Sequence, residues 1–173
     1  MSLRGGIGLP ELPIKEGKEF RLGIMGGTFD PIHYGHLVTA EQARESLDLD
    51  AVLFMPAGSP AFKLDKPVTP AEDRYAMTVL ATAANPAFLA SRFEITYTAD
   101  TLHALRDFYP PPVKLYFITG ADAIIDIVTW HDAERIAELA TFIAATRPGF
   151  DIDTARARIK ESGLPFDVRY IQI

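Results

Sequence analysis

The chain has 173 residues, of which 48% are hydrophobic and 23% are charged; this suits one globular domain and excludes a disordered or low-complexity protein. It contains no cysteine, which excludes a thiolate nucleophile, a cysteine-ligated zinc or iron–sulfur site and a disulfide scaffold. The net charge of −6 argues against a nucleic-acid surface, and no apolar run approaches the roughly 18 residues of a membrane span, so we expect a cytoplasmic protein.

Residues 1–19 differ in character from the rest of the chain. They contain three glycines within residues 5–8 and two prolines, and they show no periodic pattern of apolar residues. We therefore expect residues 1–19 to be a flexible N-terminal extension or a cloning remnant. The remaining residues show no internal repeat and no linker, which predicts a single domain over 20–173.

From residue 20 onward, short apolar runs alternate with helical patterns. Apolar runs between turn-forming residues predict strands over 20–25, 51–56, 88–95, 113–119, 141–145 and 167–173. The intervening patterns predict helices over 34–47, 70–84, 100–108, 121–128, 132–139 and 153–162. This alternation predicts an α/β fold with a doubly wound parallel sheet. Ligands of such sheets bind beyond the carboxyl ends of the strands, so the residues that directly follow strands are the candidates for a site.

The densest group of such candidates is the string GGTFDPIHYGH at residues 26–36. Two glycines at a strand end let the backbone approach a ligand, and the start of the next helix offers free N–H groups and a positive dipole end. His33 and His36 are three residues apart and point to one side of a first helical turn, while Gly35 between them would leave room for a ligand. The pattern predicts a site for a phosphate group whose charge grows during transfer. A zinc site is disfavoured, because the two histidines have no obvious third ligand.

Several motifs together resemble one enzyme family. The run HYGH at 33–36 resembles the H-x-G-H signature of the nucleotidyltransferase superfamily, and the string around it is similar to that of bacterial nicotinate-nucleotide adenylyltransferases. Later segments agree in order and spacing, namely TYTADTL at 96–102, FITGADA at 117–123, Trp130 and RPG at 147–149. The run AGSPAFK at 57–63 looks like the actinobacterial branch, since the common form has a histidine in place of Phe62. The resemblance covers residues 20–173.

This resemblance implies a Rossmann-like nucleotidyltransferase fold and a cytoplasmic enzyme of NAD biosynthesis. The enzyme would transfer the adenylyl group of ATP to nicotinate mononucleotide, giving nicotinate adenine dinucleotide (deamido-NAD) and pyrophosphate. Mg²⁺ would arrive with ATP and bridge its phosphates, with no metal site of the protein's own and no covalent intermediate. His33 and His36 would be the catalytic residues. The residues that would bind ATP or its phosphates are Gly26, Gly27, Thr28, Phe29, Lys63, Gly120, Asp122 and Arg147.

The nicotinate half of the substrate has candidates of its own. Trp130 is the only tryptophan, and its indole face could stack on a pyridine ring; the alternative is a core tryptophan. Tyr97 and Thr98 lie at a turn into a helix, where free N–H groups could donate to the carboxylate that distinguishes nicotinate from its amide.

The remaining candidates also have alternatives. Asp122 follows a strand and a glycine and suits ribose hydroxyls, but it could instead cap a helix. Lys63 and Arg147 suit phosphates, although both could be ordinary loop residues. His103 and His131 have no partner in view and are expected to be structural, and Asp30 is expected to be structural as a turn or cap residue.

Two departures from the family pattern leave other functions open. The pattern continues past the last strand into an I-S-S-T-x-I/C-R motif, whereas this sequence ends at residues 171–173, short of it. Ile95 also runs directly into Thr96, where relatives have several polar or glycine-rich residues. The alternatives are a transferase with another phosphorylated acceptor, such as nicotinamide mononucleotide or phosphopantetheine, and a non-catalytic nucleotide-binding homologue. We expect no nucleic-acid or membrane partner, and a homo-oligomer remains one alternative for the oligomeric state.

Overall fold

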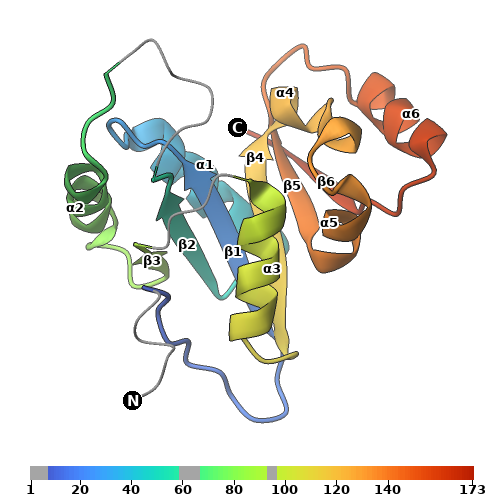
Figure 1. The fold of residues 1–173 in the computed structure, drawn as a ribbon. Coiled ribbons are helices and arrows are strands. Elements are labelled where there is room, and N and C mark those ends of the chain that lie inside the picture. Colours follow the sequence, from blue (N-terminus) through green and yellow to red (C-terminus); the bar gives the residue numbers. More distant parts are fainter. Residues whose placement is uncertain (1–7, 59–66, 93–96) are drawn as a thin grey trace.

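In the computed structural model, which describes residues 8–58, 67–92 and 97–173, six strands form one parallel sheet (Figure 1). The strands are β1 (Phe20–Gly27), β2 (Ala51–Pro56), β3 (Phe88–Ala90), β4 (Val113–Gly120), β5 (Thr141–Thr146) and β6 (Val168–Gln172). Their order across the sheet is β3-β2-β1-β4-β5-β6. The predicted doubly wound α/β fold is confirmed, with the reversal of strand order between β1 and β4.

Helices cover both faces of the sheet. They are α1 (Tyr34–Leu47), α2 (Ala71–Thr82), α3 (Thr98–Phe108), α4 (Ala121–Ile124), the 3₁₀ helix η2 (Ile127–Thr129), α5 (Ala133–Leu139) and α6 (Ile152–Ser162). The helix α3 crosses in front of the sheet in Figure 1, and α1 lies behind it. In the described part of the chain, no helix is both long and apolar enough to cross a bilayer.

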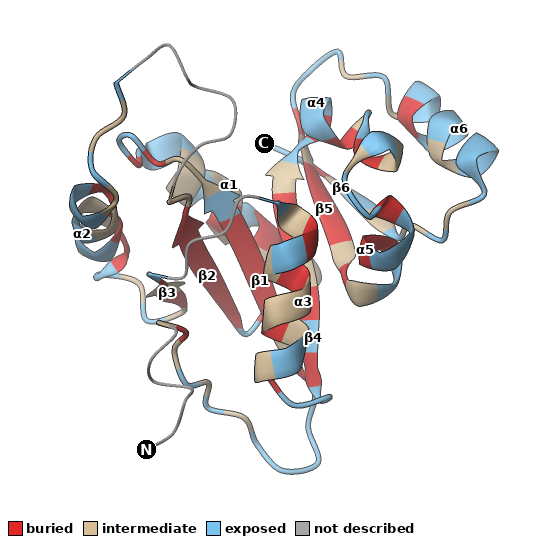
Figure 2. Ribbon diagram, viewed as in Figure 1, coloured by how far each residue is buried: buried red, intermediate tan, exposed pale blue. Residues whose placement is uncertain are grey.

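The sheet lies between two apolar clusters. Leu22 and Ile24 of β1 belong to the cluster on the side of α3 and α5, whereas Met25 belongs to the cluster on the side of α1 and α2. Every residue of β2 is buried, as expected of a strand covered on both faces. Figure 2 shows the same pattern, with a buried sheet and exposed outer faces of the helices.

Two predicted elements differ from the structure. The strand β3 ends at Ala90; Ser91 and Arg92 are not part of it, and residues 93–95 of the predicted strand lie outside the described residues. The Ser91 N–H donates to Phe54 O (2.9 Å), and its hydroxyl donates to Gly8 O (3.0 Å). The predicted helix over 121–128 is divided, because Asp126 departs from helical backbone angles and its carbonyl accepts hydrogen bonds from both the amide and the hydroxyl of Thr129. The boundaries of α1 and β2 agree with the prediction.

The segment for which we expected a flexible extension packs against the domain in part: residues 8–14 include one buried and several half-buried positions, whereas residues 15–19 are exposed. Leu9 is buried in the larger apolar cluster, and Leu12 and Ile14 pack against it. The Tyr109 hydroxyl, just after α3, donates to Pro10 O at 2.5 Å. Burial raises the pKa of the Tyr109 phenol, which therefore keeps its proton and remains a donor. Residues 1–7 lie outside the described part of the chain.

The bond between Tyr109 and Pro10 predicts a measurable contribution to stability. Tyr109→Phe would leave the half-buried Pro10 carbonyl without this donor, which should lower the free energy of unfolding by about 1 kcal/mol. Urea unfolding measures the change, and Tyr34→Phe is the matched control because the Tyr34 side chain is 84% exposed. Equal stability of the two variants would show that residues 8–19 contribute nothing to the fold through this bond.

Candidate active site

A cavity of about 570 Å³ opens where the strand order reverses, beyond the carboxyl ends of β1 and β4. The connections that follow β1 and β4 run to opposite sides of the sheet, which leaves a crevice between them. The lining comes from β1, α1, β4, β5 and the last residue of the chain: Met25, Gly26, His33, Gly35, His36, Thr39, Ile118, Thr119, Gly120, Ala145, Thr146, Arg147 and Ile173. The sequence prediction named five of these residues: Gly26, His33, His36, Gly120 and Arg147.

The two histidines cap the helix that carries them. His33 is the N-cap of α1, and its Nδ1 accepts the Gly35 N–H at 3.1 Å. The Nδ1 of His36 accepts the His33 N–H, also at 3.1 Å, which completes a capping box. A nitrogen that accepts a hydrogen bond carries no proton, so each neutral ring has its proton on Nε2. Both imidazoles therefore offer an Nε2–H donor to a ligand.

The surroundings of His36 favour its neutral form. Its ring stacks on that of His33, with 3.9 Å between centroids, and meets the edge of the buried Phe29 ring at 4.9 Å. Burial, and to a smaller extent the neighbouring His33, lower the pKa of His36 from its ordinary value of 6.5. Protonation would also remove the acceptor that holds the His33 N–H. The site thus presents His36 as an uncharged hydrogen-bond donor at neutral pH.

Gly35 is required by the His33 ring. A Cβ at this position would lie 2.8 Å from Cε1 and 3.0 Å from Nδ1 of His33, closer than real Cβ contacts allow. The room that we expected Gly35 to leave for a ligand is therefore occupied on this side by the imidazole itself. The glycine in H-x-G-H acts here by allowing the N-cap bond to form.

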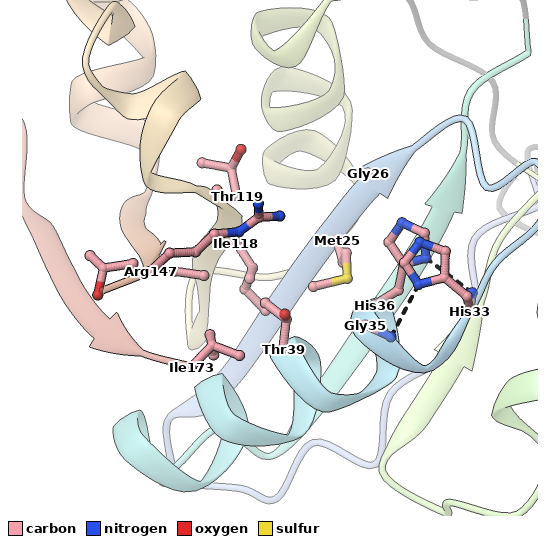
Figure 3. Close-up of a pocket in the computed structure, with 13 residues that line it drawn as sticks. Met25, Gly26, His33, Gly35, His36, Thr39, Ile118, Thr119, Arg147 and Ile173 are labelled. Carbon is pink, nitrogen blue, oxygen red and sulfur yellow. Dashed lines mark hydrogen bonds between the residues drawn. The ribbon is translucent and has the colours of Figure 1, made fainter. Parts of the chain in front are cut away.

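Arg147 faces the histidines from the other side of the cavity (Figure 3). It follows β5 and also lines a second cavity of about 470 Å³, which adjoins the first through Gly120 and Ala145. Asp122 lines this second cavity. The N-cap of α4 is Gly120, and no side chain makes a capping bond there, so the structure does not support helix capping by Asp122.

The turn between β1 and α1 contains three further predicted residues. The Gly27 carbonyl accepts the Ala57 N–H at 2.7 Å, and the Thr28 carbonyl accepts a bond from Arg74 at 2.9 Å. Phe29 has a left-handed backbone with a φ of 49° and a buried side chain. None of these three residues lines the cavity. Lys63 lies outside the described residues.

The three residues predicted for nicotinate lie outside both cavities. Tyr97 is the N-cap of α3, and its ring lies 4.9 Å from that of His131. Thr98 begins α3. Trp130 is half-buried and meets Phe117 and Phe142 edge to face, at 6.4 and 6.3 Å. The packing of Trp130 thus matches the alternative of a core tryptophan. The contact between Tyr97 and His131 places the start of α3 beside the segment that contains Trp130.

Sequence reasoning missed several polar residues of the main cavity. Thr39, Thr119 and Thr146 line it, and the Thr146 hydroxyl is engaged with Ile171 O at 3.0 Å. Thr39 lies three residues after His36, on the same side of α1, which is a signal that the sequence did contain. Within the described ranges, no three histidine, aspartate or glutamate side chains gather as a metal site.

Comparisons with known proteins point to one family. The model of the cytidylyltransferase-like family matches residues 24–168. The Moorella thermoacetica protein named "Probable nicotinate-nucleotide adenylyltransferase" is 55% identical over 157 residues, covering 87% of this chain and 70% of that protein. The protein of the same name from Corynebacterium glutamicum is 56% identical, covering 77% of this chain and 63% of its own length. This chain therefore spans about two thirds of the length of these relatives.

A solved structure has the same fold. The Plasmodium falciparum nicotinic acid mononucleotide adenylyltransferase complexed with NaAD aligns with a TM-score of 0.69 and 24% identity, covering 90% of this chain and 76% of that one. At this identity, the similarity establishes the fold.

The lowered pKa of His36 predicts a pH dependence of stability. In the window between the lowered value and 6.5, the unfolded chain binds a proton that the folded chain does not. Stability should therefore fall as the pH falls through this window. His36→Gln cannot titrate but keeps an acceptor for the His33 N–H, so this part of the pH dependence should disappear in the variant.

Urea unfolding of both proteins between about pH 5 and 7.5 measures this effect. The other three histidines are present in both chains, so the difference between the two curves isolates His36. Parallel curves would contradict the lowered pKa.

Proposed function

We propose that this chain, which belongs to the nicotinate-nucleotide adenylyltransferases of the cytidylyltransferase-like family, joins nicotinate mononucleotide to the adenylyl group of ATP in NAD biosynthesis. A phosphate oxygen of nicotinate mononucleotide attacks the α-phosphorus of ATP. The bond from that phosphorus to the oxygen shared with the β-phosphate breaks, and pyrophosphate leaves. The products are nicotinate adenine dinucleotide and pyrophosphate.

The capped histidine pair is the observation that chiefly supports this proposal. In-line phosphoryl-type transfer builds charge on the non-bridging oxygens and on the leaving group. The Nε2–H groups of His33 and His36 converge at a helix start, beside the cavity wall formed by Gly26. Their orientation is set by backbone hydrogen bonds before a ligand arrives, so little reorganisation is needed as the charge develops. Arg147 supplies positive charge from the opposite wall.

The donors in the cavity suit phosphate oxygens better than a bare cation. They include imidazole N–H groups and the Arg147 guanidinium, which do not ligate Mg²⁺, and no carboxylate side chain lines this cavity in the described part of the chain. We therefore assign Mg²⁺ to the incoming ATP, where it would neutralise phosphate charge. Gly27, Thr28 and Phe29 contribute backbone contacts to the phosphates, and Lys63 is a further phosphate ligand in this proposal.

The remaining parts of the two substrates are assigned to flanking segments. Asp122 and Gly120 take the ribose and phosphate of ATP, since both line the adjoining cavity. Trp130 stacks on the pyridine ring, for which its indole has to turn out of its present packing against Phe117. The backbone N–H groups of Tyr97 and Thr98 at the start of α3 donate to the carboxylate. The lack of cysteine fits the reducing cytoplasm, where we place the enzyme.

The first test measures pyrophosphate release with ATP, Mg²⁺ and either nicotinate mononucleotide or nicotinamide mononucleotide. We expect release with the acid to be faster by about 10- to 10²-fold, because charge-assisted hydrogen bonds to the carboxylate are lost with the amide. Equal rates would support adenylyl transfer but reject the proposal that Tyr97 and Thr98 bind the carboxylate. Absence of release with both would reject the reaction in favour of another acceptor or a binding function.

A second test separates the catalytic role of His36 from its structural one. His36→Gln keeps the capping bond and removes the imidazole donor, so turnover should fall by about 10²-fold or more while stability at neutral pH changes little. His36→Ala removes both and should also unfold more easily. His103→Gln is the matched control, since His103 lies on α3 and pairs with Asp132 away from the cavity. Turnover of His36→Gln close to that of the control would reject the catalytic role.

A further inference from the structure

Among the described residues, Arg74 is the largest fully buried side chain, with 1% of its surface exposed. It is also the only charged residue in the buried class of the described chain. Burial of a guanidinium costs free energy unless its N–H groups find acceptors. The acceptors that surround Arg74 therefore indicate its role. Arg74 lies in the first turn of α2, a helix to which the proposed reaction assigns nothing.

All its hydrogen bonds within the described residues go to backbone carbonyls of three separate segments. Its Nε donates to Thr69 O at 2.7 Å, just before α2. Its Nη1 donates to Thr28 O at 2.9 Å and to Ala57 O at 2.5 Å, and its Nη2 donates to Gly58 O at 3.0 Å. Thr28 follows β1, whereas Ala57 and Gly58 follow β2. One side chain thus joins the loops that leave two neighbouring strands.

Two further bonds hold the same turn after β1. The Ala57 N–H donates to Gly27 O at 2.7 Å, and the Thr69 N–H donates to Asp30 Oδ2 at 3.0 Å. Between them, Phe29 has a φ of 49°, a conformation that non-glycine residues adopt only where their surroundings enforce it. The turn between β1 and α1 is therefore held from the β2 side at Gly27, Thr28 and Asp30.

This turn separates the groups assigned to the phosphates. Gly26 lies before it and His33 and His36 lie after it, and all three line the main cavity. A change in the turn would alter the distance between the backbone of β1 and the two imidazoles. Displacement of reacting groups by about 1 Å can cost about 10²-fold in rate.

We propose that Arg74 is a positioning residue for adenylyl transfer, which fixes the turn between β1 and α1 and thereby the placement of His33 and His36. This inference rests on the function proposed above for the same site. Arg74 is too deeply buried to touch a substrate, so it acts through the carbonyls that it holds. A planar guanidinium spreads five N–H donors over three nitrogens and reaches three segments at once, whereas the three donors of a lysine ammonium share one nitrogen and should replace it only in part.

The test compares Arg74→Met and Arg74→Lys with a control on the same helix. Thr82→Val is the control because Thr82 is also buried, its hydroxyl bonds only within α2, to Thr78 O and Val79 O, and it lies about 12 Å further along the helix. Thermal unfolding first shows that each variant is folded at the assay temperature. Steady-state pyrophosphate release then gives kcat and KM, and ¹⁵N NMR of the histidine rings reports the Nε2–H tautomers.

We expect kcat of Arg74→Met to fall by about 10- to 10²-fold, with a smaller change in the KM of nicotinate mononucleotide and an intermediate loss in Arg74→Lys. The ring signals of His33 and His36 should move, while those of His103 and His131 stay in place. Thr82→Val should keep its kcat and its ring signals even though it loses stability.

Three results would overturn the proposal. The first is a folded Arg74→Met with kcat within about twofold of the unsubstituted protein and unmoved His33 and His36 signals. The second is an equal loss of kcat in Thr82→Val. The third concerns the case in which Arg74→Met does not fold: kcat and the histidine ring signals of Arg74→Lys would then equal those of the unsubstituted protein. If the unsubstituted protein releases no pyrophosphate, the proposed reaction fails, and the ring signals alone decide the positioning role.

Discussion

The site depends on the way in which α1 is capped by its own histidines. Helix starts leave amide N–H groups without partners, and serine, threonine or aspartate usually supplies the acceptor. Here His33 and His36 accept the N–H groups of Gly35 and His33 through Nδ1, each at 3.1 Å. These two bonds, which cap the start of α1, also orient both Nε2–H groups toward the cavity. Because helix capping and ligand geometry come from one set of contacts, rotation of either ring breaks its hydrogen bond to a backbone N–H.

The sheet and Arg74 supply the frame in which this cap works. The parallel pairing of β1 with β4 brings Met25 level with Ile118, and both line the cavity. On the other side of β1, Arg74 and the Ala57 amide hold the turn that leads to α1. The histidines are thus placed by a strand, a turn and a helix start that are each fixed by backbone hydrogen bonds. Electrostatic stabilisation of developing charge requires such preorganisation, since mobile donors would lose free energy in becoming ordered.

The features that the sequence predicted well are those decided by nearby residues. Glycines, prolines and apolar periodicity placed α1 and β2 at their observed boundaries, and the spacing of His33 and His36 predicted their convergence. The features that it missed depend on contacts between distant residues. Tyr109 bonds to Pro10 across 99 residues, and Arg74 bonds to Thr28 across 46. The sequence of residues 8–19 and of α2 contains no pattern that predicts these bonds. Every residue has a backbone carbonyl, so the identity of the accepting residue carries no signal.

The two halves of the proposed site are held by different forces. Directional hydrogen bonds hold the phosphate half, and a small rotation of either histidine breaks one of them. Ring packing holds the nicotinate half, where Trp130 meets Phe117 and Phe142 edge to face and Tyr97 lies against His131. Contacts between aromatic rings favour edge-to-face or offset geometries, and an indole that leaves one aromatic neighbour can form such a contact with a flat ring of the substrate. If the proposed function holds, the side chains between α3 and α5 therefore rearrange when nicotinate mononucleotide binds. The groups that stabilise the transferring phosphate stay in position.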